Sequence, residues 1–106
     1  MAWLILFIAG LFETAWALFL KQSHGLTRFW PTVGFLVTLA LSMILLAVAL
    51  KSLPVGTAYA VWTGIGAAAT AIIGMLWFGE SRELPKLISL AMLIGGIIGL
   101  RLTGAE

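Results

Sequence analysis

Long apolar stretches separated by short polar segments divide this 106-residue chain. About 20 predominantly apolar residues are needed to cross a bilayer. Three stretches are long enough, and a fourth, Leu87 to Leu100, is shorter, so we expect it to include Pro85, Lys86 and residues 101–103. The long cationic side chains at its ends can reach the membrane surface. The pattern predicts four transmembrane helices, at roughly 2–20, 30–50, 55–78 and 85–103.

Composition supports an all-α membrane protein with one four-helix domain over residues 1–106. Hydrophobic residues make up 62% of the chain and charged residues only 9%, far fewer charges than a soluble domain carries. The segments between the stretches are short and contain the turn pairs His24-Gly25 and Leu53-Pro54. Short connections make each helix antiparallel to the next.

The first stretch has an alternative interpretation as a cleaved signal peptide, because Ala15-Trp16-Ala17 resembles a cleavage site. No Lys or Arg precedes the apolar run, however, Glu13 interrupts it, and the run continues past the supposed site. These features favour a retained transmembrane helix.

Basic residues are nearly balanced between the two expected sides of the membrane. Lys21, Arg28, Arg82 and Lys86 lie on one side, whereas Lys51, Arg101 and the N-terminal amine lie on the other. A clear Lys/Arg bias orients a membrane protein, and this chain has almost none. Either the segment between the first two helices decides a weakly preferred orientation in the membrane, or the chain inserts in both orientations.

Glu13 is the only charged residue of the first stretch, and it lies near the middle of the predicted span. A charge at this depth costs several kcal/mol and indicates a functional site by default. Because desolvation favours the neutral carboxyl group, the side chain can exchange a proton for a cation. The alternative is a permanently protonated glutamate that is hydrogen-bonded within the helices. Its helix face also carries Leu6, Ala9, Gly10, Trp16, Ala17 and Leu20, so small residues surround the carboxyl group.

Aromatic and hydroxyl side chains on the second and third helices are further candidates. Tyr59, Trp62, Thr63 and Gly66 share a helical face, whose aromatic rings suit a cation; an ordinary packed face is the alternative. Gly64 and Gly66 weaken the helix midway and suit a hinge. Thr38 and Ser42 form a polar pair on the second helix, although such hydroxyls often bond the carbonyl one turn back.

Small residues on the fourth helix predict association between chains. Gly95 and Gly99 form a G-x-x-x-G pair, and Ser89 and Gly96 share a face. Small residues let helices approach closely in lipid, so they serve either a dimer or packing within one chain. Four helices leave little interior, which favours a cavity between two chains.

These residues together resemble the small multidrug resistance family. The E-x-x-W of Glu13 and Trp16 and the segment KSLPVGTAYAVWTGIGA at 51–67 are similar to its guanidinium-exporter subtype. The resemblance covers essentially the whole chain. It implies an antiparallel, dual-topology homodimer in the bacterial inner membrane that exchanges a guanidinium-type cation for protons.

The resemblance also implies roles for individual residues. Glu13 matches the shared substrate and proton-binding group, and Trp16, Ser42, Tyr59 and Trp62 match the other site positions, with Gly10 as the small residue beside the glutamate. Ser89 and Gly96 match the dimerisation arm, although glycine is commoner at the first position. Membrane lipid and a second copy are the implied partners, with protons as the coupling ion and no other cofactor.

Other functions stay open at the level of sequence. A broader exporter of quaternary ammonium compounds is the closest rival, although a bulky Trp16 beside the glutamate disfavours large aromatic cations. An accessory membrane subunit and a passive cation channel are two more. The single His and the absence of Cys give no metal cluster, no catalytic constellation of an enzyme is visible, and scattered basic residues do not favour nucleic-acid binding.

Overall fold

Four α-helices make up most of residues 1–103, the part of the chain that this computed structural model describes. They are α1 (Ala2–Gln22), α2 (Phe29–Ala49), α3 (Val55–Trp77) and α4 (Leu84–Thr103). Each is long and apolar enough to cross a membrane. The four expected spans are therefore confirmed, with ends that shift by at most two residues, and the chain is an all-α, multi-pass membrane protein.

Local sequence explains where the helices end. After α1, the backbone takes three successive left-handed conformations at His24, Gly25 and Leu26, with φ of 50°, 75° and 69°. Ser23 holds this turn, because its buried Oγ donates to the Leu20 carbonyl at 2.6 Å and accepts from the Leu26 N–H at 3.0 Å. At the start of α3, Pro54 is extended, with φ −60° and ψ 143°, and so precedes the first helical turn.

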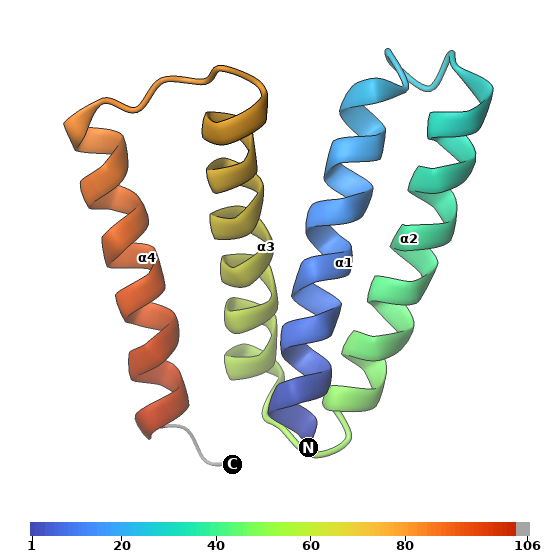
Figure 1. The fold of residues 1–106 in the computed structure, drawn as a ribbon. Coiled ribbons are helices and arrows are strands. Elements are labelled where there is room, and N and C mark those ends of the chain that lie inside the picture. The colour runs from blue at the N-terminus through green and yellow to red at the C-terminus, as the bar shows by residue number, and fades with distance from the viewer. Residues whose placement is uncertain (104–106) are drawn as a thin grey trace.

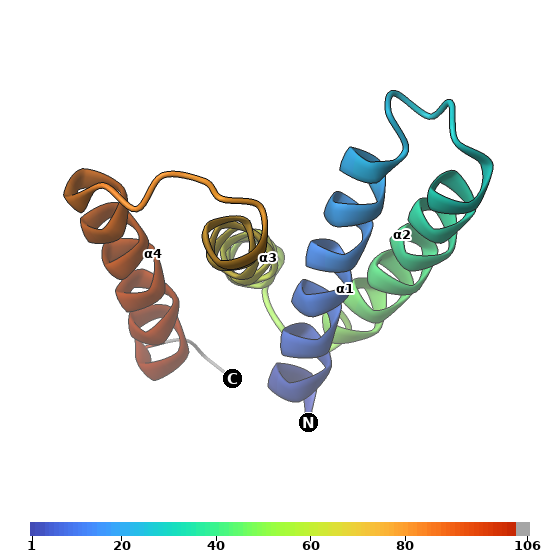
Figure 2. The ribbon, with the colours of Figure 1, turned by 45° about the horizontal axis from the view of Figure 1, so that its top comes forward.

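The helices form one layer rather than a closed bundle. Figure 1 shows them side by side in the order α4, α3, α1, α2, and the tilted view in Figure 2 keeps α4 beside α3 and far from α2. The molecule measures 41 × 35 × 17 Å, and its smallest dimension is less than two helix diameters of about 10–12 Å. Such a layer leaves two broad faces uncovered by its own chain.

The core lies where α1, α2 and α3 meet, near the connection between α2 and α3 (Figure 1). Its buried side chains form one cluster, which consists of Leu6, Ala9, Leu46, Ala49, Leu53, Ala58, Val61 and Trp62. The first two belong to the α1 face predicted from helical spacing. This cluster fixes α1 between α2 and α3, and it thereby fixes the depth of the polar groups described below.

Helix α4 packs mainly against α3. The backbone of α4 approaches no other helix, and none of its residues is buried. At the contact, a Cβ added to Gly64 would lie 2.9 Å from the Ile97 Cδ1, so this glycine lets α4 come close. On α4 itself, Gly95, Gly96 and Gly99 face open space within the described chain.

Candidate functional site

The Glu13 side chain lies between α1 and α3, midway along both helices. Its carboxylate lies against the backbone of Gly66, which has no side chain. A Cβ added to Gly66 would lie 2.5 Å from the Glu13 Cδ and would overlap the carboxylate. Within residues 1–103, the buried Oε1 accepts no hydrogen bond. A polar group without a partner is costly in a membrane interior, so this oxygen is a candidate group for binding a ligand or a proton.

Two glycines and one threonine hold α1 close to α3 around this carboxylate. An added Cβ on Gly10 would lie 2.6 Å from the Ile65 Cγ2, so Gly10 admits the Ile65 side chain. The Thr14 hydroxyl, which is buried, donates to the Gly66 carbonyl at 3.1 Å. The close partner of the glutamate is therefore Gly66, which the sequence analysis assigned to a hinge.

A buried hydrogen-bond relay joins three helices one turn away from Glu13. The Ser42 hydroxyl of α2 donates to the Ala9 carbonyl of α1 at 2.8 Å. It also accepts from the Trp62 Nε1–H of α3 at 3.0 Å. Ser42 is fully buried and Trp62 is 5% exposed. The hydrogen bond to Ser42 fixes the orientation of the Trp62 ring within the core cluster.

The two remaining predicted aromatic residues make separate contacts, Tyr59 within α3 and Trp16 with α2. The Tyr59 ring lies 5.7 Å from the Trp62 ring, tilted by 47°, and is 57% exposed. Trp16 packs edge-on against Phe35 of α2 at 5.9 Å. In the described part of the chain, the buried Trp16 Nε1 and Thr63 Oγ1 have no hydrogen-bond partner. Within residues 1–103, two donors, the Trp16 N–H and the Thr63 hydroxyl, and one acceptor, the Glu13 Oε1, are thus unpaired.

Three residues predicted to line the site or form a hinge contact their own or a neighbouring helix. The Thr38 hydroxyl donates to the Gly34 carbonyl of its own helix at 2.7 Å, which is the local alternative left open by the sequence. Helix α3 runs without a break through Gly64 and Gly66, and both glycines serve close contacts with neighbouring side chains. The hinge stays a prediction.

The structure adds residues that helical spacing alone did not single out. Thr14 follows Glu13 but points across to α3, whereas Phe35 lies opposite Trp16 on α2. Ala9 contributes its backbone carbonyl, a group that every residue has, so its residue type could not indicate this contact. A hydroxyl directly beside a membrane carboxylate was the one available sequence signal, and it pointed to Thr14.

A carboxylate beside aromatic faces and unpaired donors can bind a small organic cation or a proton. Aromatic faces attract cations, and a carboxylate accepts hydrogen bonds from their N–H groups. No group of acidic, His or Cys side chains in residues 1–103 could hold a metal ion. Fold and site together define a multi-pass membrane protein with a charged group placed in its span.

The chain belongs to the Small Multidrug Resistance protein family, whose sequence profile matches residues 1–93. A guanidinium exporter of Yersinia pseudotuberculosis serotype I (strain IP32953) is 58% identical over 102 residues, 96% of this chain and 98% of the relative. A guanidinium exporter of Proteus vulgaris is 54% identical over 102 residues, with the same shares covered. That of Escherichia coli (strain K12) is 55% identical over 103 residues, 97% of this chain and 98% of the relative. These relatives are named as exporters, which is consistent with transport rather than enzymatic activity.

Proposed function

We propose that this protein is a proton-coupled antiporter that exports guanidinium from the cytoplasm across the bacterial inner membrane. The observation that carries the proposal is the Glu13 carboxylate, which lies mid-span against Gly66 with an oxygen that accepts no hydrogen bond within residues 1–103. The names of relatives at 52–58% identity over nearly the whole chain support the choice of cation.

Guanidinium suits the chemistry of this site. The cation is planar, stays charged at physiological pH and presents paired N–H donors that match the two oxygens of a carboxylate. The Tyr59 and Trp62 rings supply aromatic faces nearby, and the relay through Ser42 holds Trp62 in place. Trp16, with its unpaired Nε1–H in the described chain, can donate to a carboxylate. Small substituted guanidines fit the same arrangement.

Protons and guanidinium compete for the same carboxylate in this proposal. A protonated Glu13 has no charge with which to hold the cation, and a bound cation excludes the proton. If the binding group faces the two sides of the membrane in turn, this competition produces exchange. The coupling ion is the proton, and no resident cofactor is needed.

Two copies of the chain complete the site. A layer 17 Å thick cannot enclose a cation by itself, and Tyr59 is more than half exposed in the single chain. The glycines of α4 provide a surface for close helix contact. The balanced basic residues support insertion in both orientations, so the proposed assembly is an antiparallel homodimer with one Glu13 from each copy.

Guanidinium-driven proton movement in liposomes tests the proposal. Wild type and Glu13→Gln are compared, with Glu80→Gln as the matched control because Glu80 lies outside the span and pairs with Lys86 at 3.4 Å. We expect a guanidinium gradient to drive protons through wild type and the control, and no exchange by Glu13→Gln.

Three results would contradict parts of the proposal. Guanidinium flux without proton movement would indicate a channel. Normal exchange by Glu13→Gln would make the glutamate structural. Equal exchange of large quaternary ammonium cations would indicate a broader multidrug exporter.

A further inference from the structure

An apolar groove runs between α1, α3 and α4. It consists of two adjoining cavities of about 260 and 310 Å³ that share Phe7, Ile65, Ile97 and Ile98. Among residues 1–103, Arg101 is the only charged residue in its lining, and it lies in the cavity that also includes Trp3 and Leu102. We call this feature the α1–α3–α4 groove. It exists because the backbone of α4 approaches α3 and not α1, which leaves the space beside α1 open.

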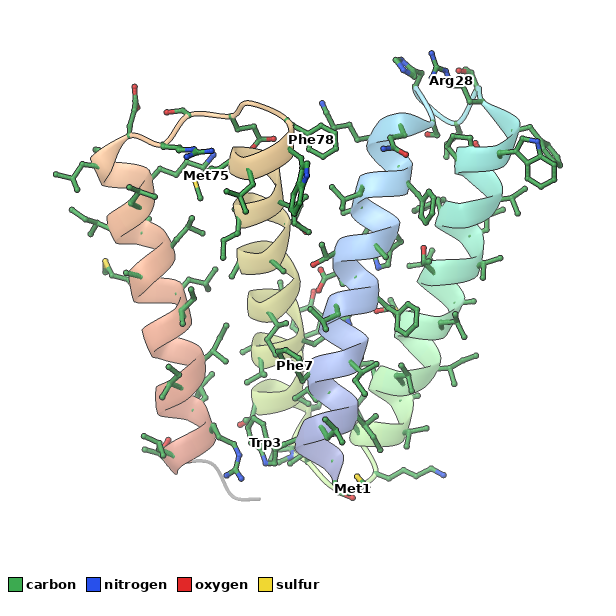
Figure 3. All side chains as sticks on the ribbon, in the orientation of Figure 1. Met1, Trp3, Phe7, Arg28, Met75 and Phe78 are labelled. Atoms are coloured by element: carbon green, nitrogen blue, oxygen red, sulfur yellow. The ribbon has the colours of Figure 1, made fainter. Side chains whose placement is uncertain are left out.

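A positively charged side chain lies at one end of this groove. The Arg101 guanidinium lies over the Trp3 ring, 5.0 Å from its centre. Within residues 1–103, Arg101 forms no ion pair, and the buried Trp3 Nε1–H has no acceptor. Trp3 is near the start of α1 and Arg101 near the end of α4, so both lie at the membrane surface (Figure 3, where Trp3 and Phe7 are labelled).

The length of the groove matches one leaflet of a bilayer. Its wall on α1 extends from Trp3 to Leu11, which corresponds to about 12 Å of helix at about 1.5 Å per residue. Half of a hydrocarbon core of about 30 Å is about 15 Å. The groove thus begins at the depth of lipid headgroups and ends near the bilayer midplane.

We propose that the α1–α3–α4 groove binds one acyl chain of an anionic phospholipid, whose phosphate accepts hydrogen bonds from Arg101. A guanidinium binds phosphate oxygens in pairs, and its stacking on the indole ring fixes its direction. The apolar walls suit the hydrocarbon chain below the phosphate. This inference does not depend on the transported cation.

A helix from a second copy fits the groove poorly. A helix with its side chains is about 10–12 Å across, and the groove walls carry the bulky side chains Phe7, Ile94 and Ile98. Close helix contact in lipid favours small residues instead. Those residues, Gly96 among them, lie on another face of α4.

Native mass spectrometry of the purified full-length protein with phosphatidylglycerol or phosphatidylcholine tests the proposal. We expect wild type to retain phosphatidylglycerol about fivefold better, because one basic residue contributes about 1 kcal/mol near a lipid with net negative charge, whereas phosphatidylcholine has none. Arg101→Gln should abolish this preference. Lys51→Gln is the matched control, since Lys51 lies on the same side of the membrane but outside the groove. It should keep the preference.

A second pair of variants tests the hydrocarbon part. Ile98→Trp fills the groove, whereas Leu36→Trp adds the same ring to an exposed position on α2. Only the former should release the lipid, with helix content and oligomeric state unchanged. Equal lipid loss in Arg101→Gln and Lys51→Gln would overturn the proposal, as would full retention by Ile98→Trp. A dimer lost in Ile98→Trp with lipid binding intact would assign the groove to a second copy.

Discussion

Replacing Gly66 with alanine tests how the Glu13 carboxylate is positioned. A Cβ at Gly66 would lie 2.5 Å from the Glu13 Cδ and 2.8 Å from its Cγ. Carbon atoms in contact prefer about 3.5–4.0 Å. The carboxyl group must therefore move by about 1 Å, because the other contact partner is the backbone of a continuous helix.

Such a displacement removes paired hydrogen bonding to guanidinium without unfolding the protein. A hydrogen bond to a charged group contributes about 1.5–3 kcal/mol, so the loss of one bond weakens binding about 10- to 100-fold. Alanine is a better helix former than glycine by about 1 kcal/mol, which limits damage to α3. We expect Gly66→Ala to express and assemble normally but to bind guanidinium 10- to 100-fold more weakly.

Calorimetric titration of the purified protein measures this change, with exchange in liposomes as a second assay. Gly56→Ala is the matched control, because Gly56 lies on the same helix and its added Cβ meets open space. It should bind as wild type does. If Gly66→Ala binds guanidinium within twofold of wild type, the carboxylate position in this structure is not the one that binds the cation.

Two further predictions concern hydroxyl groups and helix association. Ser42→Ala removes the bonds to the Ala9 carbonyl and the Trp62 Nε1–H, so it should lower the free energy of unfolding by about 1 kcal/mol at about 0.6 kcal/mol per bond. Thr38→Val removes a bond within its own helix and should lower the free energy of unfolding much less. Reversible unfolding in detergent measures both changes, and equal losses of stability in the two variants would contradict the stabilising role of the Ser42 bonds. Gly96→Leu should convert dimers to monomers, as measured by cross-linking in membranes, with the helix content kept. A stable dimer in that variant would place the contact elsewhere.

The sequence predicted the helices well because the bilayer imposes a simple rule on them. Apolar length, and the charges and prolines that interrupt it, gave every helix end to within two residues. Helical spacing also gave the face of α1 that carries Leu6, Ala9 and Gly10, all of which are buried. Both inferences concern one helix at a time.

Contacts between helices required the structure. Spacing showed that Gly66 shares a face with Tyr59, but it contained no information on which helix lies opposite or how far away. The contact of Gly66 with Glu13 and the bond from Trp62 to Ser42 depend on those distances. The single layer of helices was likewise not predictable, since a closed bundle has the same apolar pattern. The roles predicted for the site residues and for the glycines of α4 stay predictions.

The position of α4 at the edge of the layer has a consequence for the order in which the protein is made. Among residues 1–103, every buried residue lies at or before Met75. All buried residues of the core cluster therefore leave the ribosome before α4, which adds the partly buried Ile97 and Leu100 to it. The glycines with which α4 can meet another helix emerge last. The core can thus begin to form before α4 emerges, and any contact made through the α4 glycines must come later.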